Sequence, residues 1–139
     1  MSPADIFGAR NKIGRRIDGA SLEIRLGDPP PSSNNMFANV PGKGRIKSKL
    51  YNLWIESAGW EARTQSVNRV GGSVLIDITV FRMSKIADID NRVKACIDLL
   101  VAHDLIDDDK NVQEIRARWS NERGCKIVVS RIQDSAVAA

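Results

Sequence analysis

The chain has 139 residues, 42% of them hydrophobic and 27% charged, which is the composition of one globular domain with its own hydrophobic core. No apolar run is long enough to span a membrane, and no basic segment followed by an apolar one indicates a secretory signal, so we expect a cytoplasmic protein. The net charge of +4 favours a polyanionic partner, and one histidine with two distant cysteines excludes a zinc site.

The first predicted elements are a basic arm, a strand and a long loop. Residues 1–19 show no periodicity and carry several Arg and Lys, so we interpret them as a basic arm that is either mobile or a short frayed helix. Leu22, Ile24 and Leu26 alternate with polar residues and predict a half-buried strand, which consecutive prolines end. Residues 27–46 are predicted to form a long loop, and such loops in compact domains are usually functional or disordered.

Two amphipathic helices follow from apolar residues that recur at three- and four-residue steps. They are predicted over residues 48–65 and 90–102. Cys96 lies in the second helix and Cys125 in a later strand pattern, and we expect both thiols to be buried and free, with a disulfide as the less favoured alternative. The buried face predicted for the second helix consists of Val93, Cys96, Ile97, Leu100 and Val101.

Three further strands complete the predicted fold. Alternating residues predict strands over 74–80, 115–119 and 125–129, and residues 121–124 are interpreted as a hairpin connection between the last two. The order β-α-β-α-β-β predicts a small α/β or α+β domain, with a mixed sheet of about four strands and its two helices on one side. The predicted boundaries are 1–19 for the arm, 20–132 for the domain and 133–139 for the tail.

Acidic residues gather in one stretch of this basic chain. Between Asp88 and Asp109 there are seven acidic and two basic residues, so the rest of the chain is strongly basic. Asp88 and Asp90 stand two apart at the exit of a strand, and in an extended backbone both carboxylates point to the same side. Asp90 also suits an N-cap, and Lys94 follows one turn later. A strand–helix–strand unit can return the turn at residues 107–109 to the neighbourhood of the first two aspartates.

Converging carboxylates repel one another, and a divalent cation removes that repulsion. Hard oxygen ligands suit Mg²⁺, which keeps several waters and accepts substrate phosphate, and two ions about 4 Å apart can support in-line phosphodiester cleavage. Lys94 would add positive charge near the developing negative charge. Simpler interpretations stay open: Asp90 as a plain helix cap, Lys94 as a surface partner of Asp98, and residues 107–109 as a solvated turn.

The motifs resemble those of the RusA family of Holliday-junction resolvases, small endonucleases associated with phages and prophages. The stretch Asp88-Ile89-Asp90-Asn91-Arg92-Val93-Lys94-Ala95 and the later Asp108-Asp109-Lys110-Asn111-Val112 carry the resemblance, together with Pro30-Pro31-Ser32-Ser33-Asn34-Asn35. It covers about residues 20–132. The resemblance implies a homodimer that binds four-way junctions and makes paired, symmetric nicks with Mg²⁺, for which Mn²⁺ is an alternative ion.

The resemblance also assigns roles to residues of this chain. Asp88, Asp90 and Asp109 match the catalytic, metal-binding carboxylates of the family, Lys94 matches its essential lysine, and Asp108 matches an acid beside the catalytic one. Three features depart from the family pattern: Ala87 stands where the best-known member has a basic residue, the basic arm is extra, and Asp107 makes the turn a triple acid, which leaves open which two of the three face the metal. The DNA-binding residues that we predict are Lys43, Arg45, Lys47, Lys49 and Asn35.

Other functions remain as alternatives. The chain is predicted to be a junction endonuclease, and a metal-dependent nuclease for other branched DNA or for RNA is the nearest alternative. A non-catalytic DNA-binding module would use the same basic residues, but no helix-turn-helix or zinc pattern supports it. A phage accessory protein with Trp54 and Trp60 as interface anchors is a third. For the dimer, Leu75 and Trp119 are the predicted interface residues, with burial under a helix as the competing explanation.

Overall fold

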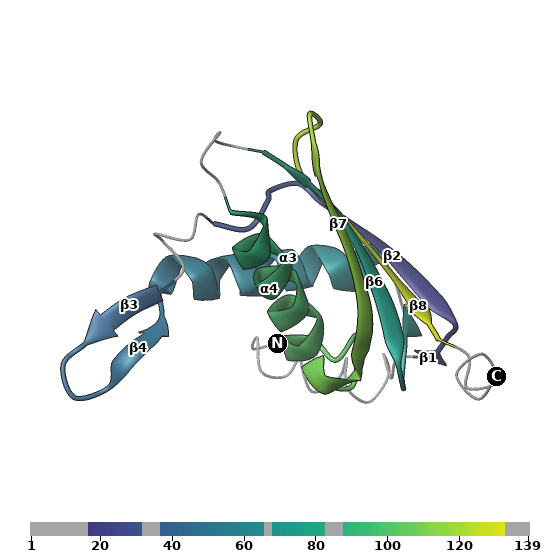
Figure 1. Ribbon diagram of the computed structural model, residues 1–139, viewed down its shortest axis with the longest axis horizontal. Helices are drawn as coiled ribbons and strands as arrows, with labels where there is room; N and C mark the ends of the chain where they lie inside the picture. Colours follow the sequence, from purple (N-terminus) through teal and green to yellow (C-terminus); the bar gives the residue numbers. More distant parts are fainter. Residues whose placement is uncertain (1–16, 32–36, 66–67, 83–87, 133–139) are drawn as a thin grey trace, which may run out of the picture.

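A computed structural model describes residues 17–31, 37–65, 68–82 and 88–132, and Figure 1 shows its ribbon. Asn35, Ala87, most of the predicted arm and the predicted tail lie outside the described residues. Neither of the described helices has the length and hydrophobicity of a membrane span.

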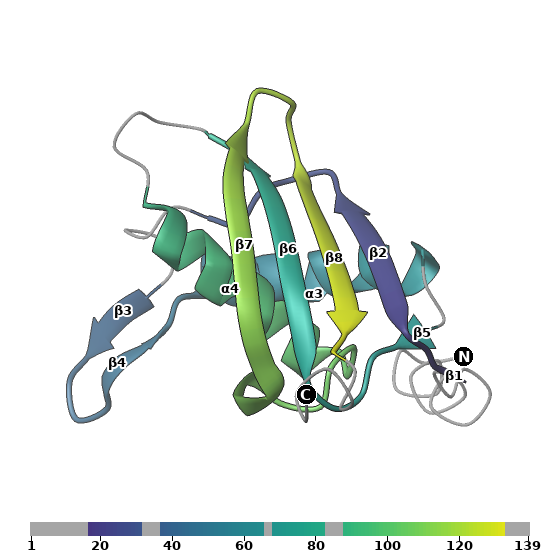
Figure 2. The same ribbon diagram turned by 45° about the vertical axis from the view of Figure 1, so that its right-hand side comes forward.

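The centre of the fold is a sheet of four strands in the order β2-β8-β6-β7, seen side by side in Figure 2. Its strands are β2 (Ser21–Leu26), β6 (Val74–Phe81), β7 (Val112–Ser120) and β8 (Cys125–Arg131). Strand β6 pairs in parallel with β7 and antiparallel with β8, and β8 pairs antiparallel with β2. The mixed α+β sheet is confirmed.

The predicted hairpin over residues 121–124 is wrong, although the connection itself is short. Strands β7 and β8 do not pair with each other, because β6 lies between them. The helix that follows β6 crosses over and returns the chain as the parallel neighbour β7. The connection then passes over the end of β6, and β8 takes the place between β6 and β2.

Two helices cover one face of the sheet, α3 (Lys49–Gln65) and α4 (Ile89–Ala102), as Figure 1 shows. The alternating strands bury their inward side chains completely at Ile24, Ile76 and Ile127. Cys96 of α4 and Cys125 of β8 are both buried and free, with their Sγ atoms 3.7 Å apart. The expectation of buried free thiols is therefore confirmed.

A short hairpin stands where the sequence predicts a loop over residues 27–46. Strands β3 (Phe37–Val40) and β4 (Gly44–Lys47) pair antiparallel and extend away from the sheet and helices in Figure 1. Gly42 and Gly44 make the turn, with φ angles of 80° and 74° that favour glycine. Because β4 is exposed throughout, it lacks the apolar alternation that marks a buried strand.

A pair of short strands and a 3-10 turn lie at the end of the sheet where β6 begins. Strand β1 (Ile17–Asp18), which falls within the predicted arm, pairs in parallel with β5 (Asn68–Arg69). A single 3-10 turn, η1 (Asp109–Asn111), leads into β7.

The buried face of α4 is rotated from the predicted one. Its buried residues are Arg92, Ala95, Cys96, Leu99 and Leu100, whereas Val93 and Ile97 are only partly buried and Val101 is 36% exposed. The reason is that α4 packs beside β7, the edge strand, and nothing in the described chain covers the outer side of that pair.

Strand β7 leaves apolar side chains uncovered beside α4. Ile115, Ala117 and Trp119 pair in register with the buried residues of β6 and so point to the helix side of the sheet. Even so, Ile115 is 46% exposed, and Ala117 and Trp119 are only partly buried. Leu75 is on the opposite face, so the two residues predicted for the dimer interface do not share a surface. We name the uncovered apolar surface the edge strip, formed by Val93, Ile97, Val101, Ile115, Ala117 and Trp119.

Candidate active site

Two of the predicted catalytic acids open helix α4. Asp88 is the N-cap, with an extended backbone (φ −102°, ψ 119°), and its Oδ1 accepts a hydrogen bond from the backbone N–H of Asp90 at 2.9 Å. Its Oδ2 accepts from Nδ2 of Asn91 at 3.3 Å. The prediction that Asp90 caps the helix is wrong, because the helix begins at Ile89 and Asp90 lies in its first turn. Both carboxylates are exposed, at the helix end where the backbone dipole favours negative charge.

The other pair of acids lies just before β7. Asp108 precedes the 3-10 turn and Asp109 begins it, and their carboxyl groups are close enough to share a hydrogen bond. That hydrogen bond and the negative charge of Asp108 raise the pKa of Asp109, while the hydrogen bond from Asp109 lowers the pKa of Asp108. Two carboxylates in this relation resist being charged together, which a bound cation would relieve.

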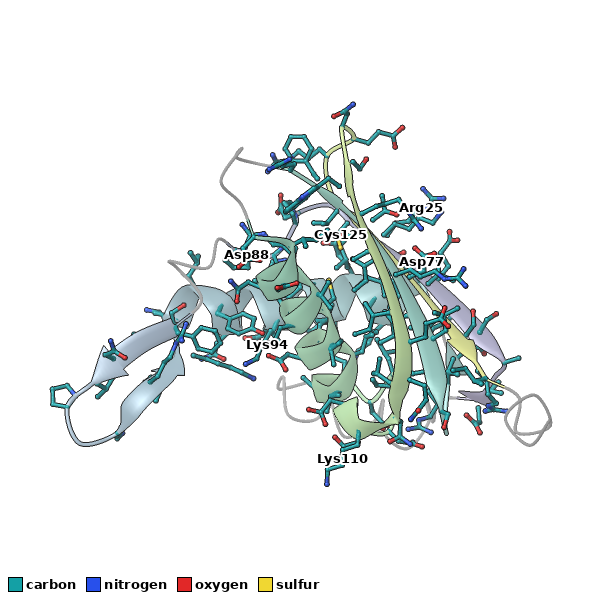
Figure 3. All side chains as sticks on the ribbon, in the orientation of Figure 1. Arg25, Asp77, Asp88, Lys94, Lys110 and Cys125 are labelled. Carbon is teal, nitrogen blue, oxygen red and sulfur yellow. The ribbon has the colours of Figure 1, made fainter. Side chains whose placement is uncertain are left out.

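Helix α4 separates the two acidic pairs. It has 14 residues, and at 1.5 Å per residue it is about 20 Å long. Figure 3 shows Asp88 at one end of α4 and Lys110, the neighbour of Asp109, at the other. The expected convergence inside one chain is therefore wrong, because a crossover helix runs back along the whole length of its strand. Among the described residues, no three acidic, histidine or cysteine side chains are grouped closely enough to hold a metal ion.

Asp107 has a separate, structural set of partners. Its Oδ1 accepts a hydrogen bond from the guanidinium of Arg69, and its Oδ2 accepts from the backbone N–H of Gly72 at 2.9 Å. These contacts, first the Gly72 N–H and then Arg69, lower the pKa of Asp107. Of the three consecutive acids, Asp107 is thus tied to the start of β6, and Asp108 and Asp109 form the pair.

Lys94 does not pair with Asp98. The Asp98 carboxylate accepts a hydrogen bond from the Tyr51 hydroxyl at 2.5 Å and lies 3.9 Å from the Nζ of Lys47. Lys94 instead places its Nζ 5.4 Å from the centre of the Phe37 ring, and Figure 3 shows it on the side of α4 that faces the hairpin. The simpler interpretation of Lys94 as the surface partner of Asp98 is therefore excluded.

The basic residues predicted to bind DNA belong to the hairpin and the start of α3. Lys43 lies in the exposed turn, Arg45 and Lys47 lie on β4, and Lys49 is the first residue of α3. Arg45 covers the Phe37 ring at 4.4 Å and Lys47 lies 5.6 Å from the Tyr51 ring centre. The structure thus brings Arg45 to the Phe37 ring that Lys94 also approaches, and Lys47 to Asp98 of the same helix.

Arg92 is a site residue that the sequence did not single out. Its side chain is 3% exposed, and Nη1 donates a hydrogen bond to the backbone carbonyl of Pro31 at 2.7 Å. Burial lowers the pKa of Arg92, and the nearby charge of Asp88 opposes this. Arg92 therefore fastens the proline segment to α4 beside the first acidic pair. The sequence did contain an indication of this burial, because Arg92 lies four residues before the buried Cys96 and therefore on the same side of the helix.

Comparison with known proteins decides the family. The profile of the family described as endodeoxyribonuclease RusA matches residues 27–130, which contain the hairpin, both helices, β6, β7 and most of β8. The chain belongs to this family. Membership makes it an endodeoxyribonuclease and implies action on DNA junctions, as the RusA resemblance of the motifs predicts. A search among curated proteins found no match.

Proposed function

We propose that this RusA-family chain is a Mg²⁺-dependent endonuclease that cuts four-way DNA junctions as a homodimer. In each of its two active sites, Asp88 and Asp90 come from one protomer, and Asp108 and Asp109 come from the partner. The observation that carries this proposal is the separation of the two acidic pairs by the length of α4, about 20 Å. Ligands of one metal ion must all lie within about 2–2.6 Å of it, so a single chain cannot complete the site.

The edge strip supplies a surface for such a dimer. It runs along α4 and β7 between the two acidic pairs, and its residues are more exposed than apolar residues of a covered sheet face. Asp90 precedes Val93 by three residues and Ile97 by seven, so it lies on the same side of α4 as the strip. A two-fold axis across the middle of α4 would set two such helices antiparallel and bring the start of one beside the end of the other.

The donor set of the composite site fits Mg²⁺. Its four carboxylates, exposed or partly exposed, are hard oxygen ligands, and a bound cation would relieve the interaction with Asp108 that raises the pKa of Asp109. When bound, Mg²⁺ supplies water activation and stabilisation of the leaving oxygen, and Mn²⁺ is the alternative ion. The chain itself holds the Asp88 carboxylate in place through two hydrogen bonds and presents the Lys94 ammonium about one turn after Asp90 on α4.

The basic residues of the hairpin would hold the DNA backbone beside this site. Arg45 lies over the Phe37 ring that Lys94 also approaches, Lys43 and Lys47 are on the same hairpin and Lys49 begins α3, and such cations bind phosphates without regard to sequence. Carboxylates alone repel DNA, so binding to the hairpin and neutralisation of the acids by metal act together. Asn35 stays a prediction for the same interface.

We place this activity in the cytoplasm. The thiols of Cys96 and Cys125 are adjacent yet unbonded. Reducing compartments maintain such thiols, whereas oxidising ones promote disulfides.

The test is cleavage of a supercoiled plasmid with an extruded cruciform, compared with a linear duplex, with Mg²⁺ and with EDTA. We expect cleavage only of the cruciform and only with Mg²⁺. Asp88→Asn, Asp90→Asn and Asp109→Asn should each abolish cleavage but retain junction binding, because they remove negative charge that faces phosphate. Near wild-type cleavage by any of the three would remove that residue from the ligand set, and metal-independent cutting would refute the proposed chemistry.

A further inference from the structure

Two cations from different elements share one aromatic ring. The ring of Phe37, at the start of β3, has the Arg45 guanidinium 4.4 Å from its centre and the Lys94 ammonium 5.4 Å from it. The two groups therefore lie within about 10 Å of each other, each inside the range of attraction to an aromatic ring. One belongs to the hairpin and the other to the helix that carries Asp88 and Asp90.

Within the described residues, neither cation has an ion pair with a carboxylate. Asp98, one turn after Lys94 on α4, accepts a hydrogen bond from the Tyr51 hydroxyl and lies 3.9 Å from the Nζ of Lys47. Like charges that are close together repel, so the attraction of both cations to the Phe37 ring opposes their repulsion, and a bound anion would be favoured beside them. In an endodeoxyribonuclease, the backbone phosphates of DNA are anions of the kind that such a pair of cations attracts.

The ring is itself held in a fixed orientation. The Phe37 and Tyr51 rings meet edge to face, with centres 5.7 Å apart and planes at 73°. Tyr51 is fully buried and its hydroxyl is fixed by Asp98 of α4. A chain of contacts therefore runs from α4 through Asp98 and Tyr51 to Phe37, and returns to α4 at Lys94.

We propose that Phe37 is a positioning residue that holds Arg45 and Lys94 as one phosphate clamp on the DNA strand to be cut. Arg45 holds the bound strand, and Lys94 meets the charge that grows during cleavage. Phe37 acts through both cations rather than by touching the reacting atoms. The part that concerns Lys94 rests on the proposed function, whereas the part that concerns Arg45 requires only that the chain bind junction DNA.

The first experiment measures junction binding without metal, by anisotropy of a labelled four-way junction, so it does not depend on cleavage. Phe37→Leu, which keeps an apolar side chain but removes the ring, should weaken binding about three- to fivefold, as should Arg45→Ala. The double variant should be no weaker than Arg45→Ala alone. Lys43→Ala is the matched control on the same hairpin, because Lys43 contacts no aromatic ring of the described residues. Its loss of affinity should multiply with the loss caused by Phe37→Leu. Phe37→Tyr, which keeps the ring, should restore binding.

The second experiment measures single-turnover cleavage at saturating junction with Mg²⁺. Phe37→Leu should slow cleavage, Phe37→Tyr should restore it, and Phe37→Leu combined with Lys94→Ala should be no slower than Lys94→Ala alone. If the effect of Phe37→Leu instead multiplies with the binding loss of Arg45→Ala or with the rate loss of Lys94→Ala, the clamp is refuted. A purely structural role of Phe37 would have the same effect in wild type and in every variant. If the wild-type protein binds junctions but does not cut them, the proposed nuclease function fails. The binding measurements on Phe37→Leu, Arg45→Ala and their double variant would still decide the role of Phe37.

Discussion

A mixture of two inactive variants, Asp90→Asn and Asp109→Asn, should recover cleavage if the active sites are shared between protomers. In a mixed dimer, one site contains both Asp90→Asn and Asp109→Asn and is inactive. The other combines the wild-type Asp90 of one protomer with the wild-type Asp109 of the partner subunit and is complete. If each site were instead confined to one chain, both sites of the mixed dimer would carry one of the two substitutions, and the mixture would stay inactive.

The expected recovery follows from counting sites. After full exchange of equal amounts, half of the dimers are mixed and each has one complete site of two, so about a quarter of the wild-type sites are restored. The structural reason is distance, because α4 holds the two acids of one chain about 20 Å apart, whereas paired catalytic ions are about 4 Å apart.

The assay is cleavage of the cruciform plasmid after the two purified variants have been mixed and allowed to exchange subunits. The mixture should give nicked circles with few linear molecules, because a mixed dimer has a single working site. Each variant alone should give neither product. A fully exchanged mixture, shown by mass spectrometry of tagged protomers, that remains inactive would refute the shared site.

Three further predictions follow from the same geometry. Lys94→Ala should lower the single-turnover rate on the order of 100- to 1000-fold with little change in affinity, and an unchanged rate at saturating junction would contradict its role. Asp107→Asn should keep cleavage but lose about 1 kcal/mol of stability in urea unfolding at neutral pH, after allowance for its solvent exposure. Since its folded-state pKa is lowered, that difference between wild type and variant should be full above the ordinary pKa of aspartate and disappear as the pH falls through the lowered one. Ile115→Lys should give a folded, inactive monomer of 15.3 kDa by light scattering, and an active dimer of this variant would exclude the edge strip as the interface.

The sequence predicted those elements whose residues enter the core. Leu22 and Ile24 alternate with polar residues because β2 buries one face, and the structure confirms both the strand and its burial. The hairpin β3–β4 was not predicted, because it packs little of its length against the core. Its sequence therefore lacks the alternation of apolar and polar residues that marks a half-buried strand. The place of β8 between β2 and β6 was also not predicted, because it depends on pairing between strands that are distant in sequence.

For the site, the sequence indicated the chemistry of the residues but not their distances. Carboxylates at Asp88, Asp90, Asp108 and Asp109 were recognised from their motifs, and all are present at the surface or partly exposed. Their separation was calculable from the predicted helix over residues 90–102, since a helix of that length must carry the chain about 20 Å away. Phe37 carried no signal, because an aromatic residue beside a loop is not distinctive until the cations that surround it are known.

A shared site links assembly to the outcome of cleavage. A single protomer presents two acidic pairs that are too far apart to hold one ion between them, so the separated chain has no complete centre with which to nick DNA. In the proposed dimer, a two-fold axis would complete both centres at once, because each protomer would give the start of α4 to one site and the end of α4 to the other. The same pair of helices would then hold the two centres at a fixed spacing. A junction of approximate two-fold symmetry is cut cleanly only when two opposed strands are nicked, and an enzyme built in this way either has both of the necessary centres or has neither.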